Sequence, residues 1–126
     1  MIGYVTLGTN DMEKAAAFYD ALLGELGAVR FMEMETFIPW SVDPNQPALS
    51  VTKPFDGNAA TVGNGTMVAL IVDSNDKVDA IYAKAIEQGA TDEGPAGPRG
   101  EGGFYAGYFR DLDGNKLNVF CMTPQS

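Results

Sequence analysis

The sequence of 126 residues contains no histidine and a single cysteine, Cys121. Without histidine, the chain lacks the side chain that most often serves as a metal ligand or as a general base near neutral pH. A lone cysteine forms no internal disulfide, and here only an arginine or a lysine could lower its pKa enough for nucleophilic work. We therefore expect Cys121 to be a buried strand residue, in a protein of the reducing cytoplasm.

Positive charge is also scarce. Eight Lys and Arg stand against seventeen Asp and Glu, which gives a formal net charge of −9. Such a surface repels phosphate backbones and anionic lipids, which argues against nucleic acid and membrane surfaces as partners. The sequence contains no apolar run of about eighteen residues and no basic segment ahead of an apolar run at its start, so we predict neither a membrane span nor a secretory signal.

The sequence contains an internal repeat. A shift of 63 residues lays Tyr4–Leu7 over Met67–Leu70 and brings Tyr19 onto Tyr82. Each half then has the pattern of a strand, a helix, a glycine that ends the helix, and further strands. We predict a single domain, residues 1–126, built of a first module at 1–56, a connection at 57–65 and a second module at 66–126.

The two helices carry the clearest local signals. We expect Asn10 to cap the first helix and Gly27 to end it, because short polar side chains accept from free amides and glycine adopts the left-handed conformation. The second helix is expected to begin at Asp73 or Ser74 and to end at Gly89. Apolar residues recur at helical spacing in both, so each helix should place one face on a sheet.

Alternation and turn residues predict the strands. Phe104–Phe109 and Lys116–Cys121 read as a hairpin joined by Asp111–Asn115. Gly94–Gly103 is rich in glycine and proline and is predicted to form a mobile loop, either a lid over a pocket or an ordinary connection. Two or three short strands should close the first module, and they contain Phe31, Phe37, Ile38, Leu49 and Val51.

Two βαβββ modules in tandem, with Asn10–Ala15 leading into Phe18-Tyr19 and with the motif Phe109–Leu117 near the end, resemble the vicinal oxygen chelate superfamily. That superfamily includes glyoxalase I, extradiol dioxygenases, and fosfomycin- and bleomycin-resistance proteins. The resemblance covers essentially the whole chain. It implies an α+β fold in which the modules form a curved, mostly antiparallel sheet around a cleft.

The resemblance also places the usual metal ligands of the family. Its two histidines fall at Tyr4 and Met67, and its glutamate falls at Asn118. A phenol, a thioether and a neutral amide are poor ligands for the divalent metals that imidazole and carboxylate bind well. We therefore predict no metal and no other cofactor, with a divalent metal recruited through other residues as the weaker alternative.

Strand alternation then predicts which side chains share the cleft. Six candidates follow from the three metal positions and their neighbours on the same side: Tyr4, Thr6, Met67, Ala69, Asn118 and Phe120. Four further candidates are Trp40, Arg99, Tyr105 and Tyr108. The aromatic ones could line the cleft or belong to the core, and Arg99 could contact an anionic group or water.

The resulting cavity would be mostly apolar, which suits a neutral or aromatic small molecule, unless Met67 and Phe120 fill it. The leading functional prediction is a homodimer that binds a small organic ligand without metal catalysis, similar to the bleomycin-resistance members, which are acidic dimers and sequester a cationic ligand. One alternative is a lyase, isomerase or dioxygenase-type enzyme with an atypical site. Another is a degenerate module that acts only in dimerisation.

Overall fold

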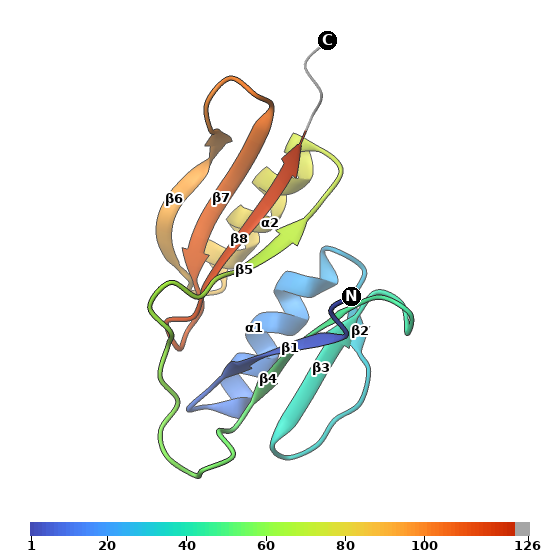
Figure 1. Ribbon diagram of the computed structural model, residues 1–126, viewed down its shortest axis with the longest axis vertical. Helices are drawn as coiled ribbons and strands as arrows, with labels where there is room; N and C mark the ends of the chain where they lie inside the picture. Colours follow the sequence, from blue (N-terminus) through green and yellow to red (C-terminus); the bar gives the residue numbers. More distant parts are fainter. Residues whose placement is uncertain (123–126) are drawn as a thin grey trace.

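The computed structural model describes residues 1–122, and both halves follow the predicted βαβββ order (Figure 1). The first module contains β1 (Tyr4–Gly8), α1 (Met12–Gly24), β2 (Val29–Arg30), β3 (Phe37–Ser41) and β4 (Ala48–Thr52). The second contains β5 (Val68–Ile71), α2 (Asn75–Glu87), β6 (Thr91–Pro98), β7 (Phe104–Arg110) and β8 (Lys116–Met122). The α+β class and the tandem arrangement are confirmed. Within residues 1–122, no helix has both the length and the apolar character needed to cross a membrane.

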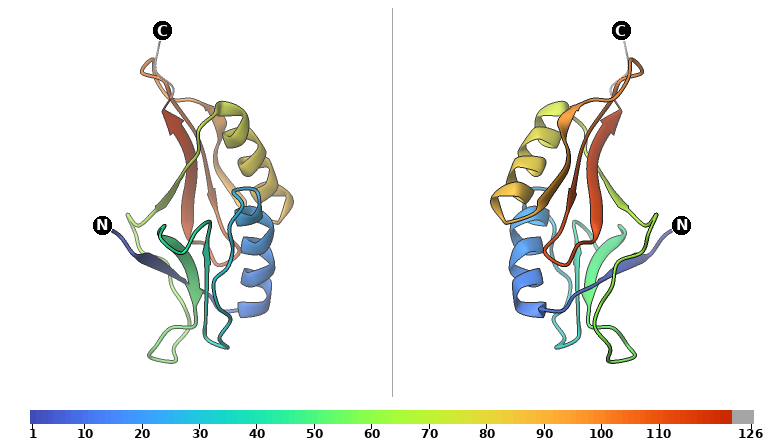
Figure 2. Two further views of the ribbon diagram at one scale, coloured as in Figure 1. Left: turned by 90° about the vertical axis from the view of Figure 1, so that its right-hand side faces the viewer. Right: turned by 90° about the vertical axis from the view of Figure 1, so that its left-hand side faces the viewer.

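Each module forms its own four-stranded sheet, with the orders β1-β4-β3-β2 and β5-β8-β7-β6. The first and last strands of a module pair in parallel, and the remaining pairs are antiparallel. A parallel pair needs a crossover, and in each module the helix supplies part of it. Seen from the side, α1 and α2 lie together on one side of the strands (Figure 2). The opposite side of both sheets is therefore free of helices.

A single buried cluster runs through both modules and is completed by contacts between α1 and α2. Its largest fully buried members are Trp40, Tyr19, Phe18 and Phe109. Cys121, with 1% of its surface exposed, belongs to the same cluster, as its position in the sequence predicted. The modules thus share one core, so the site must be sought on the faces that this core does not occupy.

The N-cap of α1 is one residue away from its predicted place. Asp11 is the capping residue, and its carboxylate accepts from the backbone N–H of Lys14 at 3.1 Å. Asn10 instead bonds Ala60 twice, donating to its carbonyl and accepting from its N–H. A carboxylate at this helix end is also favoured by the helix dipole, and Asn10 is used to hold the connection between modules.

The other helix boundaries agree with the sequence. Ser74 caps α2 by accepting from the N–H of Lys77 at 3.2 Å. Gly27 and Gly89 follow the helices with φ of 81° and 104°, values that favour glycine. Directly after Gly27, the N–H of Ala28 donates to the carbonyl of Leu23, as in a Schellman cap.

The glycine-rich segment Gly94–Gly103 is only partly a loop. Strand β6 runs through the first half of this segment to Pro98 and pairs with β7. The pairing shifts register on either side of Gly94. This glycine has φ of 153°. The prediction of a mobile loop over the whole segment was wrong, because β6 lies at the sheet edge, where proline and bulges are tolerated. In the first module, Phe31 lies just beyond β2 rather than within a strand.

Candidate functional site

Each sheet has one face packed on the helices and one face turned away from them, which we call the open face. Alternation and strand register assign the residues of both. The first open face is formed by Tyr4, Thr6, Phe37, Pro39, Ser41, Ala48 and Ser50. The second open face is formed by Ala69, Ile71, Ala106, Tyr108, Asn118 and Phe120. Met67 lies one residue before β5 and is 40% exposed.

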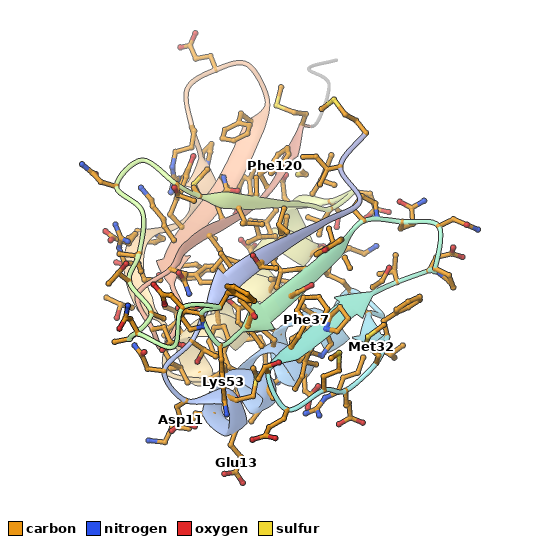
Figure 3. All side chains as sticks on the ribbon, turned by 60° about the horizontal axis from the view of Figure 1, so that its bottom comes forward. Asp11, Glu13, Met32, Phe37, Lys53 and Phe120 are labelled. Carbon is orange, nitrogen blue, oxygen red and sulfur yellow. The ribbon has the colours of Figure 1, made fainter. Side chains whose placement is uncertain are left out.

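A pocket of about 330 Å³ hollows the first open face. Its walls are mainly apolar and include Tyr4, Phe31, Met32, Phe37, Pro39 and Pro44. Met32 and Phe37 lie next to each other on the side of the first module (Figure 3). The rings of Tyr4 and Phe37 meet edge to face, with centroids 5.9 Å apart. Ser41 and Gln46 add polar groups to the lining, and none of the residues that line this pocket is charged.

Sequence reasoning missed most of this pocket. Among the described residues, Tyr4 is the only one of the ten predicted candidates that lines it. Phe31 and Met32 come from the segment after β2, and Pro44 and Gln46 come from the turn between β3 and β4. The available signal was the cluster of large apolar residues Phe31, Met32 and Met34, because exposed apolar residues gathered on a loop often mark a binding site.

The second open face has a different chemistry. Ala69, Asn118 and Tyr108 form one row across β5, β8 and β7. Two cations approach the ring of Tyr108, Arg99 at 5.5 Å and Lys116 at 5.7 Å from its centroid. Arg99 is held in place, because its guanidinium donates to the carbonyl oxygens of residues 95 and 97 at 2.6 and 2.9 Å. It is therefore a fixed group on the sheet edge, not part of a lid.

Phe120 packs within the second open face, where its ring lies 5.5 Å from that of Phe104. Figure 3 shows Phe120 and Phe37 apart, on different modules. The structure thus divides five of the six cleft candidates into two groups, and the sixth, Met67, lies just before β5. Tyr4 and Thr6 lie on the first open face, and Ala69, Asn118 and Phe120 lie on the second.

Two candidates belong to the helix-facing side. Trp40 is 2% exposed, and its indole N–H donates to the carboxylate of Asp20 at 2.9 Å. Of the two alternatives for Trp40, the core is therefore the one the structure shows. Tyr105 packs against the core and donates to Asp79 of α2 at 2.6 Å, which raises the pKa of its phenol. Neither residue is available to a ligand on an open face.

Two polar atoms lie buried on the open faces without a hydrogen-bond partner among residues 1–122. They are the Oγ of Ser50, in a residue that is 0% exposed, and the Oδ1 of Asn118, in a residue that is 2% exposed. Ser50 pairs with Thr6, and Asn118 pairs with Ala69. Because the internal repeat superposes Thr6 on Ala69, the two unpartnered groups occupy equivalent positions in the two modules.

A charged hollow lies beside α1, lined in part by Asp11, Glu13 and Lys53 (Figure 3). Its arginine, Arg30, forms an ion pair with Asp20 at 2.6 Å. The hydrogen bond from Arg30 is the main reason that the pKa of Asp20 is below its ordinary value. Four acidic and two basic residues line this hollow, and Arg30 is already paired with Asp20, so its lining is charged and mainly acidic, unlike that of the uncharged pocket.

The family's metal positions do not fit a divalent metal in this chain. Tyr4 is 63% exposed and is engaged with Phe37 on the first module, whereas Asn118 is buried in the second sheet. Over residues 1–122, no three His, Cys, Asp or Glu side chains are grouped so that they could hold a metal ion. Phenol, thioether and amide remain, and this donor set lacks the imidazole and carboxylate that such ions prefer.

Comparison with known families supports the fold. The family model described as Glyoxalase/Bleomycin resistance protein/Dioxygenase superfamily matches residues 1–119. A solved glyoxalase/bleomycin resistance protein from Albidiferax ferrireducens T118 is 35% identical and superposes with a TM-score of 0.88, covering 98% of this chain and 99% of that one. No curated protein matches the chain.

More distant structures share the fold alone. A genomically encoded fosfomycin resistance protein from Listeria monocytogenes is 18% identical, with a TM-score of 0.75 over 98% of this chain and 93% of that one. A lactoylglutathione lyase from Agrobacterium tumefaciens is 19% identical, with a TM-score of 0.72 over 96% and 92% of the two chains. The activities in these names differ from each other, so they select none for this chain.

Proposed function

This chain belongs to the glyoxalase/bleomycin resistance protein/dioxygenase superfamily, and we propose that it binds a small, uncharged, mainly apolar organic molecule in the pocket of the first open face. The observation that carries the proposal is the pocket itself, about 330 Å³ in volume and lined by aromatic, proline and methionine side chains. Cavities of a few hundred cubic ångströms with apolar walls and few polar groups are typical of small-molecule sites.

The lining also narrows the ligand class. A buried charge needs a partner, and none of the residues that line the pocket carries one. A cationic ligand, the kind suggested by the resemblance to bleomycin-resistance proteins, would therefore be placed poorly in this pocket. The chain's net charge of −9 attracts cations to its surface in general, but it places no carboxylate in the pocket to pair with them.

An NMR titration of the labelled protein with uncharged aromatic compounds tests this proposal. We expect shifts at the backbone amides of Phe31, Met32 and Gln46, and weaker binding of charged analogues. Phe37→Ala should weaken binding about tenfold, because a wall of the pocket is removed. Phe104→Ala is the matched control, since it removes a ring from the second open face, and it should leave affinity unchanged. Shifts confined to the second open face would contradict the proposal.

We also propose that binding proceeds without metal-assisted catalysis. The support is the donor chemistry at Tyr4, Met67 and Asn118, which lacks imidazole and carboxylate. Elemental analysis of protein purified without added metal provides the test, and we expect no stoichiometric transition metal after dialysis. A metal that survives dialysis and is lost in Tyr4→Phe or Asn118→Ala would favour an enzyme with an atypical site.

A homodimer completes the proposal. Large apolar side chains stand exposed on two edge strands, with Val29 of β2 68% exposed and Ile71 of β5 70% exposed. Exposed apolar groups on unpaired edges favour association. Light scattering should therefore give twice the chain mass of 13.4 kDa, and Ile71→Asp should shift the mass toward that of one chain. A monomer at all concentrations would refute the dimer without affecting the pocket.

A further inference from the structure

The strand register places Ser50 at the centre of the first open face. It lies on β4, between Thr6 of β1 and Pro39 of β3. Two residues to either side along β4, the pairs are Ala48 with Tyr4 and Thr52 with Phe37. Tyr4 and Phe37 therefore start on opposite strands and on opposite sides of Ser50.

The two rings nevertheless come within 5.9 Å of each other, at an interplanar angle of 75°. Rings that start on either side of β4 reach this separation only by leaning over the strand between them. Register and ring separation together place the pair over Ser50, which is 0% exposed although its face carries no helix. Tyr4 itself is 63% exposed, so the cover lies at the surface.

The hydroxyl beneath this cover is unsatisfied. The Oγ of Ser50 has no hydrogen-bond partner among residues 1–122. Leaving such a group unpaired lowers stability, so packing alone would favour alanine at this position. The two rings of the cover meet edge to face, and such a contact is only weakly stabilising. A ligand that separates the rings and pairs with the hydroxyl can remove the cost of the unpaired group and replace the lost ring contact.

Ser50 does not line the pocket itself, but Tyr4 and Phe37 do. We propose that Ser50 is the polar anchor beneath the pocket wall and that the Tyr4–Phe37 pair is its displaceable cover. This inference rests on the proposed function and names the ligand class more closely: a flat, ring-bearing, uncharged molecule with one hydroxyl or carbonyl group. The ring replaces the contact between Tyr4 and Phe37, and its polar group reaches the Oγ of Ser50. A serine hydroxyl both donates and accepts, so either polar group satisfies it.

The test compares two probes of nearly equal shape, 4-ethylphenol and 4-ethyltoluene, whose affinities are measured by NMR titration. We expect the phenol to bind the wild-type protein about tenfold more tightly, the effect of one buried hydrogen bond. Ser50→Ala should reduce this ratio to about one to twofold, mainly by weakening the phenol. Thr6→Val removes the neighbouring hydroxyl with little change of shape and should preserve the ratio.

Folding of each variant is checked from its amide spectrum, and Ser50→Cys serves as a second variant with only a weak hydrogen-bonding group. It should also lower the ratio. Failure of both probes to bind the wild-type protein would refute the proposed function and this inference together. Binding of both with a ratio that survives in Ser50→Ala and Ser50→Cys would leave the pocket intact and refute the anchor. A ratio lost in Thr6→Val instead would assign the anchor to Thr6 and overturn the role of Ser50.

Discussion

The bond between Tyr19 and Asp111 connects the two modules, and its removal should destabilise the whole fold. The phenol of Tyr19 on α1 donates to the Oδ2 of Asp111 at 2.6 Å, and both residues are buried. Asn115 donates to the same carboxylate at 3.0 Å and also to the carbonyl of Gly8 in β1 at 2.9 Å. The turn between β7 and β8 is therefore tied to the first module by polar contacts inside the protein.

Tyr19→Phe removes one donor from this carboxylate while the ring keeps its packing. A hydrogen bond to a charged group contributes about 1.5–3 kcal/mol, and Asp111 retains its bonds from Asn115 and the turn amides. We expect the free energy of unfolding to fall by about 2 kcal/mol and the Tm by about 6–10 °C. Asp111→Asn should cost more, because its amide nitrogen would face two donors in either orientation: the phenol and the Asn115 side chain, or the backbone N–H groups of Asp113 and Asn115.

The repeat supplies a matched control. Tyr82 occupies the place of Tyr19 in the second module and also donates to an aspartate, Asp92, at 2.7 Å, but this bond is exposed. Tyr82→Phe should therefore change stability far less. Urea unfolding followed by the fluorescence of Trp40, the only tryptophan, measures both variants. Equal effects of the two substitutions, or a loss below about 0.5 kcal/mol for Tyr19→Phe, would refute the reasoning.

The same bond predicts a response to alkaline pH. Burial, followed by the charge of Asp111, raises the pKa of Tyr19 well above its ordinary value of 10.0. Above pH 10 the unfolded chain loses this proton while the folded chain keeps it, so stability falls as pH rises. Each such proton contributes a slope of up to about 1.4 kcal/mol per pH unit. Tyr19→Phe should therefore flatten the curve between pH 10 and 11, whereas an unchanged slope would exclude Tyr19 as its source.

Three further substitutions test the packing and the charges. Gly107→Ala should destabilise by about 1–3 kcal/mol in urea unfolding, because its Cβ would lie 2.9 Å from the ring of Tyr82. Gly24→Ala, at the end of α1 with no atom within 4 Å of the added Cβ, should stabilise by about 0.5–1 kcal/mol in the same assay. Asp20→Asn should weaken the loss of stability in acid, since the lowered pKa of Asp20 favours the folded state above its unfolded pKa and this contribution disappears as pH falls.

Much of the fold follows from patterns in the sequence, because the spacing of apolar residues and the glycines that end helices depend on neighbouring residues. Gly27 and Gly89 end the helical segments as predicted, and Ser74 caps α2. The N-cap at Asp11 was missed because Asn10 is an equally good capping residue. The choice between them depends on Ala60, which is fifty residues away and bonds Asn10. β6 was missed because its pairing with β7 overrides a composition of glycine and proline.

The candidate site was less predictable, because it depends on which strand faces pack on the helices and which remain open. Alternation correctly paired Tyr4 with Thr6 and Asn118 with Phe120, but it could not show that the apolar pocket lies on the face of the first pair. Trp40 was ambiguous because a large ring serves equally in a core or in a binding wall. Its position was decided by Asp20, which accepts from its indole N–H.

The two modules share their interior more closely than their open faces, and this difference indicates where function lies. Tyr19 and Tyr82 each donate to an aspartate, as expected if the common frame is preserved after duplication. The open faces differ. The first module has Tyr4 with its aromatic partner where the second has Met67, and the first has an uncharged pocket where the second has a basic face. Substitutions on these faces leave the shared core intact, so the fold persists with Tyr4, Met67 and Asn118 at the positions where the resemblance expects metal ligands.

Packing does not account for Ser50 and Asn118, the two equivalent buried groups whose oxygens lack partners within residues 1–122. A buried polar atom without a partner lowers stability wherever it occurs, and an apolar residue of similar size would remove this penalty at either position. An unpartnered buried polar atom occurs at the same place in both modules. This recurrence favours a role that packing does not supply. For Ser50 the adjacent pocket and the aromatic cover provide that role. If so, Ser50→Ala should leave the free energy of unfolding unchanged or raise it by about 1 kcal/mol while it weakens binding, a combination that a purely structural serine would not produce.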